Sequence, residues 1–162
     1  MASASKYLAT YLNDHLFGAT LGAELARRAA RENEGSELGA FLDDLAREIE
    51  DDRETLLALM GELGVTADRA KVAAGWTAEK LGRLKPNAQL RGYSPLSPLV
   101  ELEGLLTGVQ GKLAMWRSLA EVAESLGLER ARFEELGARA EVQQADVERH
   151  RLATARTALT AV

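Results

Sequence analysis

Residues 106 to 116 read LTGVQGKLAMW, and Lys112 interrupts a run that otherwise has the spacing of a buried helical face. Steps of three and four residues place this lysine on one stripe with six apolar residues, namely Leu102, Leu105, Val109, Trp116, Leu119 and Ala123. A charged side chain on such a stripe needs a partner, because an unpaired buried charge costs several kcal/mol. The stretch therefore predicts a core helix with an ion pair at its middle.

Composition limits what kind of protein this is. The chain has 162 residues, which suits one domain over residues 1–162. Its 20 basic and 25 acidic residues alternate in sign along the predicted helices, giving a net charge of -5. This pattern argues against a nucleic-acid or anionic-membrane partner, since either would need a concentrated basic patch. The absence of cysteine excludes disulfides, thiolate nucleophiles and zinc–thiolate sites.

No stretch of the sequence has the character of a targeting or membrane segment. The opening MASASKYLAT lacks an apolar core of signal-peptide length, and no run approaches the roughly 20 apolar residues that a membrane span requires. We therefore expect a cytoplasmic protein.

The residue types predict an all-α fold. Ala, Leu, Glu and Arg dominate, strand signals are missing, and proline occurs only at Pro86, Pro95 and Pro98. Apolar stripes indicate four amphipathic helices of about 25 to 30 residues each. Gly35, Gly64 and the LGL of residues 126–128 are predicted to end helices one, two and three. Ser36 and Ser97 are predicted to cap the starts of helices two and three.

The lengths of the connections predict the topology. Helices one and two meet across about three residues, as do helices three and four, and such short loops join antiparallel neighbours. Between these two hairpins lie residues 64–97, which are long enough to cross over along the bundle and which are predicted to hold a short helix from Thr66 to about Leu84. The expected fold is a four-helix bundle with a long crossover between helices two and three.

Pairing the helices in this topology predicts a polar cluster at mid-bundle. Antiparallel alignment about the two loops places His15 opposite Asp52, and Lys112 opposite about Gln144. The predicted cluster joins Lys112 to Glu48 or Asp52, and the other members follow: His15, Glu141 and Gln144. Two other interpretations stay open. In one, the Lys112 methylenes are buried beside Trp116 while the ammonium reaches water; in the other, Glu48 and Glu141 are exposed.

The two hairpins and the long crossover resemble the ferritin-like superfamily, whose members carry a dimetal carboxylate site at mid-bundle. That resemblance implies a glutamate on helices one and three and Glu-x-x-His on helices two and four. Here helix two offers EIED (residues 48–51) and helix four offers EVQQ (residues 141–144), each without the histidine. At the matching heights, helix one has residues 18–20 (GAT), and helix three has Lys112.

These departures from the family pattern predict a bundle without a metal cofactor. A dinuclear site normally uses four carboxylates to balance its charge, and this sequence provides fewer at the right positions. An ammonium group among two or three carboxylates would repel a divalent cation, and it can itself supply the positive charge. We therefore interpret Lys112 as a replacement for the metal.

Glycines within the helices suggest close packing. Gly18 and Gly22 in helix one, like Gly104, Gly108 and Gly111 in helix three, each cost about 1 kcal/mol relative to alanine. One explanation is tight packing of helices one and three inside the monomer. The other is a glycine face that associates with a second copy, and a homodimer is the expected assembly.

The sequence leaves three functions open, and an enzyme is not the favoured one. The first is a non-catalytic, metal-free ferritin-like bundle with a structural, interaction or ligand-holding role. The second is a ferritin-like metal-carboxylate protein with a reduced site, built from His15, Glu48, Asp51 or Asp52, Glu141 and Gln144. The third is a small-molecule binding module whose pocket is lined by Trp76, Tyr93 and Trp116.

Overall fold

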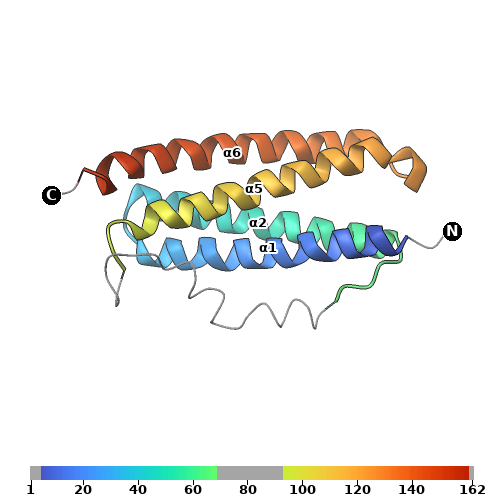
Figure 1. Ribbon diagram of the computed structural model, residues 1–162, viewed down its shortest axis with the longest axis horizontal. Coiled ribbons are helices and arrows are strands. Elements are labelled where there is room, and N and C mark those ends of the chain that lie inside the picture. Colours follow the sequence, from blue (N-terminus) through green and yellow to red (C-terminus); the bar gives the residue numbers. More distant parts are fainter. Residues whose placement is uncertain (1–4, 69–92, 161–162) are drawn as a thin grey trace.

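The residues that the structure describes form four long helices that lie side by side along one axis (Figure 1). The computed structural model describes residues 5–68 and 93–160. The helices are Lys6–Glu32 (α1), Glu37–Glu62 (α2), Ser97–Val122 (α5) and Arg130–Ala158 (α6), with a short 3-10 helix at Glu124–Leu126 (η1). They contain 27, 26, 26 and 29 residues, and the described ranges contain no strand. The prediction of an all-α four-helix bundle is confirmed.

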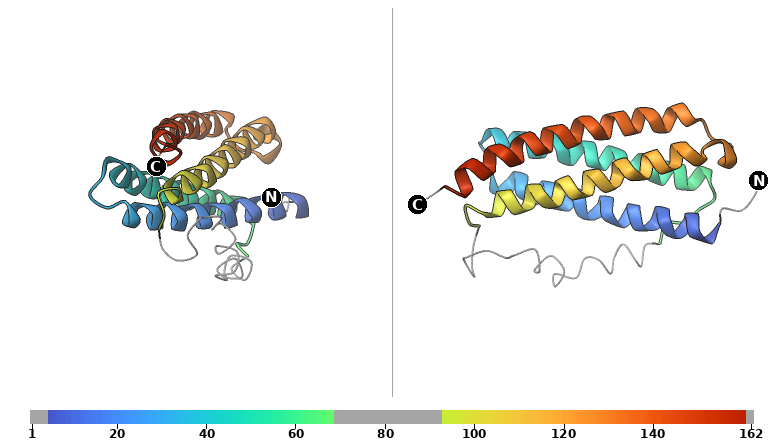
Figure 2. Two further views of the ribbon diagram at one scale, coloured as in Figure 1. Left: turned by 60° about the vertical axis from the view of Figure 1, so that its left-hand side comes forward. Right: turned by 45° about the horizontal axis from the view of Figure 1, so that its top comes forward.

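The helices form two antiparallel hairpins, α1 with α2 and α5 with α6, and both views in Figure 2 show the hairpins stacked on each other. The α5 helix runs antiparallel to α1, because Arg28 near the end of α1 forms an ion pair of 2.7 Å with Glu101 near the start of α5. Antiparallel contacts also join α2 to α6, where Glu62 pairs with Arg132 and Phe41 stacks on His150.

The two described ends of the connection between the hairpins lie towards opposite ends of the bundle. At one end, the Asn13 amide donates to the Thr66 carbonyl at 3.2 Å, and at the other the Asn33 amide donates to the Tyr93 hydroxyl at 2.7 Å. The 20 residues of helix between those asparagines rise about 30 Å. Residues 66–68 are not helical, and the rest of the short helix predicted for this segment lies outside the described residues.

Most of the predicted helix ends are confirmed by their backbone geometry. Gly35 and Gly64 have φ of +81° and +66°, values that glycine adopts without a Cβ penalty. The Ser36 hydroxyl accepts from the Gly39 N–H at 3.0 Å, as an N-cap does. The Val65 N–H donates back to the Met60 carbonyl at 2.8 Å, which is the six-to-one bond of a Schellman ending.

The two ends of α5 differ in how well they were predicted. Gly127 has φ of +71° and the Leu128 N–H bonds the Ala123 carbonyl at 2.9 Å, which confirms the LGL ending after a turn of 3-10 helix. The prediction that Ser97 caps α5 is wrong. Ser97 is the first helical residue, and its hydroxyl accepts from the Ser94 N–H at 3.0 Å, so it fixes the preceding turn instead.

Two apolar clusters make up the core, one towards each end of the bundle. The first gathers around Trp116, which is fully buried and stacks on Phe133 with ring centroids 6.3 Å apart. The second contains smaller side chains. It consists mainly of alanines of α1 and leucines of α2 and α5, among them Ala23, Ala26, Ala29, Leu42, Leu45, Leu102 and Leu105. Within the described residues, no helix has the length and apolarity needed to cross a membrane.

A matched pair of glycines in α2 tests the hairpin geometry. A Cβ on Gly39 would lie 2.2 Å from the Asn33 carbonyl oxygen, whereas a Cβ on Gly61 would meet nothing within 4 Å. We expect Gly39→Ala to lower the free energy of unfolding by about 1–3 kcal/mol. Gly61→Ala should leave it unchanged or raise it by up to about 1 kcal/mol. Urea denaturation followed by circular dichroism measures both, and equal effects of the two changes would contradict this packing.

Candidate functional site

A network of polar side chains lies at the middle of the bundle, between the two apolar clusters. The Lys112 ammonium donates to Asp52 Oδ2 and to Gln143 Oε1. The Arg139 guanidinium donates to the other Asp52 oxygen, and Gln143 Nε2 donates to Glu48 Oε2 at 2.9 Å. We call these five residues the polar centre. It joins α2, α5 and α6 at one height, and its members saturate both oxygens of Asp52.

Burial makes this network electrostatically strong. The Asp52 side chain is 4% exposed and that of Lys112 is 12% exposed, whereas Arg139 reaches solvent at 45%. Loss of hydration lowers the pKa of the Lys112 amine to about 8, and the charge of Glu48 opposes this shift. The amine is therefore still mostly protonated at pH 7, where it balances the Asp52 carboxylate.

The structure brings together three of the six residues predicted to form this cluster: Lys112, Asp52 and Glu48. Lys112 pairs directly with Asp52, while Glu48 joins through the Gln143 amide. In the alternative interpretation, the Lys112 ammonium extends into bulk water. The structure contradicts it, because the ammonium donates inward to Asp52 and Gln143. Glu48 is exposed as a residue even though its carboxylate accepts this bond.

Glu141 and Gln144 do not take part in the polar centre. Glu141 is exposed and forms a surface ion pair of 2.7 Å with Arg117. Gln144 borders a surface groove between α5 and α6, beside Glu103 and Arg151. The reason is helical rotation, since neighbouring residues lie about 100° apart and Gln143, rather than Gln144, faces inward.

His15 lies near the polar centre without joining its network. It borders the same cavity as Asp52 and Lys112, and its ring meets Tyr11 edge-on with centroids 4.6 Å apart. Burial lowers the pKa of His15 below 6.5, although the charge of Asp14 opposes the shift. The imidazole is therefore neutral at pH 7, and it can donate or accept a hydrogen bond within the cavity.

Two members of the polar centre, Arg139 and Gln143, were not predicted. They lie one helical turn apart on α6, on the face that also carries Ala140 and Val147. That spacing was the available signal, since a basic and an amide side chain four residues apart can reach one carboxylate together.

A cavity of about 80 Å³ lies beside the polar centre, among α1, α2 and α5. Its polar lining residues are His15, Asp52, Lys112 and Trp116. Trp116 is fully buried, and in the described part of the chain its indole Nε1–H has no hydrogen-bond partner. Such an orphan donor is rare in native proteins and calls for a physical explanation.

Glycines of α1 and α5 leave the space that forms this cavity. Gly18 and Gly22 of α1 line it together with Gly104 and Gly108 of α5. Tight packing inside the monomer, one of the two explanations that the sequence left open, does not apply at Gly18 and Gly108, where a Cβ would meet nothing within 4 Å. Only Gly104 is tight, with Leu25 3.3 Å from the Cβ position. The absent side chains leave space between the helices, and Gly18 and Gly108 lie exposed at its rim.

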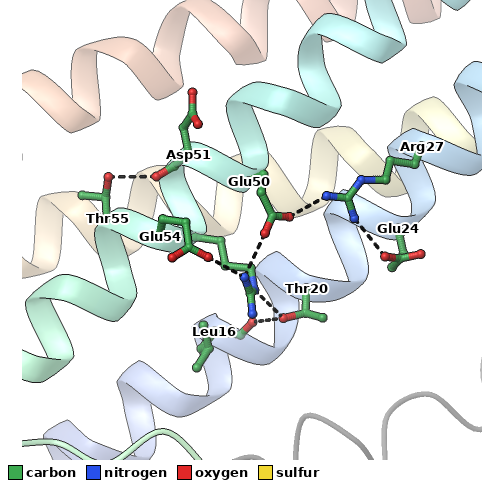
Figure 3. A network of polar contacts seen from close by, with 9 residues as sticks. Leu16, Thr20, Glu24, Arg27, Glu50, Asp51, Glu54 and Thr55 are labelled. Carbon is green, nitrogen blue, oxygen red and sulfur yellow. Dashed lines mark hydrogen bonds and ion pairs between the residues drawn. The ribbon is translucent and has the colours of Figure 1, made fainter.

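The neighbouring acidic residues of α2 serve a separate surface network that joins α1 to α2 (Figure 3). Arg53 donates to Thr20 at 3.1 Å and pairs with Glu50 at 2.9 Å, and Glu50 also pairs with Arg27 at 2.8 Å. Figure 3 shows the Asp51 side chain pointing away from this network, and Asp51 is exposed. These acids therefore do not turn towards the polar centre.

The residues at mid-bundle do not fit the dimetal site that the family resemblance implies. Of the reduced ligand set, Asp51, Glu141 and Gln144 lie elsewhere, which leaves Asp52 and Glu48 in the polar centre and His15 at the cavity beside it. Across the described ranges, no group of three or more His, Asp or Glu side chains could hold a metal ion. The Lys112 ammonium lies among the remaining oxygens, where its charge would repel a divalent cation.

Comparisons with protein-family models, with curated proteins and with solved structures found no match to this chain. No similar protein therefore indicates the chemistry of this site.

Removing the ammonium tests its pairing with Asp52. We expect Lys112→Met to lower the free energy of unfolding at pH 7 by about 2 kcal/mol, because a buried carboxylate then keeps only the half-exposed Arg139 as its counter-ion. Asp52→Leu combined with Lys112→Met removes both charges, so it should recover at least half of that loss. Urea denaturation of the single and double variants forms a double-mutant cycle. Strictly additive effects would contradict the pairing.

The surface pair Arg117–Glu141 provides the matched control for this cycle. Both side chains are more than half exposed, so Arg117→Met should change the free energy of unfolding by no more than about 0.5 kcal/mol.

The lowered pKa of Lys112 predicts a specific pH dependence. Between pH 8 and 10.5 the unfolded chain binds more protons at this amine than the folded chain does, so the free energy of unfolding rises with pH across this window. The two pKa values set the full rise at about 3 kcal/mol. Lys112→Met lacks this contribution, and the stability difference in favour of the wild type should widen from pH 7 to 10. A difference that shrinks would show that the folded-state pKa is raised.

Proposed function

We propose that this chain is a non-catalytic, metal-free, ferritin-like bundle that holds a small molecule in the cavity beside Lys112. The observation that carries the proposal is the cavity itself, in which mainly apolar walls surround a few convergent polar groups. Pockets with this combination are the usual binding sites of small ligands.

The polar centre contributes to this function by fixing the cavity wall. Lys112 bonds both Asp52 of α2 and Gln143 of α6, which holds its ammonium beside the cavity. Because two of its three protons are already used, this amine is tethered and is suited to orienting a ligand. A general base or nucleophile would need a free lone pair, so the arrangement favours binding over catalysis.

This proposal replaces the pocket lining expected from the sequence. Trp116 lines the cavity, but Tyr93 lies at the end of the bundle, where its hydroxyl donates to Glu101 at 2.7 Å. Trp76 lies outside the described residues. Burial and the Glu101 carboxylate raise the pKa of Tyr93, which ties its hydroxyl to a structural role.

A panel of small fragments tests ligand holding without assuming the ligand. Saturation-transfer NMR on the full chain should detect fragments that bind the wild type and that no longer bind Gly108→Leu, whose side chain would fill the cavity. Gly111→Leu is the matched control, because Gly111 also has open space at its Cβ position but does not line the cavity. Identical fragment binding by all three proteins, or no binding at all, would reject the proposed function.

The metal-free part of the proposal has its own test. Protein purified without chelators should contain iron, manganese and zinc far below one atom per chain, and added Mn(II) should leave its melting temperature unchanged. A near-stoichiometric metal content would show that Lys112 does not replace the cation.

The predicted homodimer remains part of the proposal. Gly18 of α1 and Gly108 of α5 are exposed and have open space at their Cβ positions, so a second copy can approach there without meeting their side chains. Sedimentation equilibrium of the wild type should therefore give twice the monomer mass, and Gly18→Leu should shift it towards 17.5 kDa. A wild type that sediments as a monomer would reject this element while leaving the ligand proposal intact.

A further inference from the structure

The walls of the cavity between α1, α2 and α5 point to one class of ligand. We propose that this cavity binds a neutral, apolar molecule of about three or four non-hydrogen atoms, the size of a short hydrocarbon, against Ile49, Leu105 and Val109. This inference rests on the proposed ligand-holding function and adds the chemistry of the ligand.

Apolar side chains of α2 and α5 line the cavity. The α2 helix contributes Ile49 and Leu56, and α5 contributes Leu105, Val109 and Met115. Each of these five residues is buried, with no more than 6% of its surface exposed. A lining of this kind favours an apolar occupant, because the transfer of apolar surface out of water is favourable.

The charged groups beside the cavity have their partners within the protein. Both oxygens of Asp52 accept hydrogen bonds, one from Arg139 and the other from Lys112. The Lys112 ammonium also donates to Gln143, whose amide donates to Glu48. The two cations of the polar centre are thus matched by two carboxylates. An ionic ligand would bring a charge without a counter-ion, and burial penalises such a charge.

The two other polar residues of the lining do not require a polar ligand either. The Nε1 atom of Trp116 is buried, so a molecule in the cavity does not reach it. His15 is only partly buried, and its ring nitrogens therefore keep access to water. Burial also lowers the pKa of His15, so the imidazole adds no charge at pH 7.

The volume of the cavity limits the size of the ligand. A cavity of about 150 Å³ with aliphatic walls stays dry and binds benzene or xenon. Scaled from the six carbons of benzene, about 80 Å³ holds about three or four non-hydrogen atoms. Cyclopropane and isobutene are hydrocarbons of this size. Such a molecule would restore the packing contacts that an empty apolar space lacks.

Small groups form the rim of the cavity between α1 and α5. Gly18 and Gly108 are exposed there, and no described atom lies within 4 Å of the Cβ position of either glycine. Among the described residues, the rim therefore leaves a path for a short hydrocarbon.

Ile49 provides a reporter that needs no assignment, because it is the only isoleucine in the sequence and it lines the cavity. Selective ¹³C labelling of the isoleucine δ1 methyl group gives one signal from the cavity wall. The full chain is titrated with cyclopropane and isobutene, and with acetamide and sodium acetate as polar molecules of similar size at constant ionic strength. We expect a saturable shift of the Ile49 signal with both hydrocarbons. The two polar molecules should bind at least tenfold more weakly.

Variants test whether binding occurs in this cavity. Gly108→Leu should abolish the saturable shift, whereas Gly111→Leu should retain it, because Gly111 does not line the cavity. Val109→Ala removes two carbons from the wall, so it should admit benzene, which the wild type should exclude. If Gly108→Leu fails to fold, the change of size limit in Val109→Ala decides the question.

The outcomes distinguish this inference from the function on which it rests. Fragments that bind the wild type but not Gly108→Leu, together with hydrocarbons that give no saturable shift, would overturn the ligand class and leave ligand holding intact. Acetamide or acetate that binds as tightly as the hydrocarbons would overturn the ligand class as well. Hydrocarbon binding that persists in Gly108→Leu would overturn the placement in this cavity. If no fragment and no hydrocarbon binds, both proposals fail.

Discussion

The ion pair between Lys112 and Asp52 is the constraint on which the middle of this bundle depends. It lies where the two apolar clusters meet, and it ties α5 to α2 through side chains that are almost fully buried. Neither charge can be removed alone without leaving the other desolvated, so each helix must keep its height relative to the other. Arg139 and Gln143 extend the same requirement to α6. The polar centre thus fixes the register of three helices that apolar packing alone would allow to slide.

Much of the fold was predictable from the sequence because its signals are local. The positive φ of Gly35, Gly64 and Gly127 at helix ends follows from glycine being the residue that adopts it most easily. The two short loops then require antiparallel hairpins, and the length of residues 64–97 requires a crossover. Ser97 was misread because a serine before proline is a good cap by type. Whether its hydroxyl turns to the helix or to Ser94 depends on the turn at residues 94–97, which the pattern does not encode.

The site was less predictable, for a reason of geometry. Over the 50 or so residues of a hairpin, an error of one residue turns a side chain by about 100°, which is enough to move it from the core to the surface. On α6 the apolar stripe fits Gln143 and Gln144 about equally well, and only the position of α6 against α2 decides between them. Lys112 and Asp52 were found because each interrupts an otherwise apolar stripe. Arg139 was missed because half of its side chain is in solvent, and it therefore leaves no such interruption.

The glycines connect the polar centre to the cavity. In a helix interior, each glycine lowers stability relative to alanine, and the usual compensation is close contact between backbones. At Gly18 and Gly108 that compensation is missing, because a Cβ at either position would meet only open space. Alanine at either position would meet no clash and would remove the cost of the glycine. The same space borders Lys112, whose ammonium is tethered to Asp52 and Gln143. Loss of packing and a buried ion pair thus occur at one place, where α1, α2 and α5 surround the cavity.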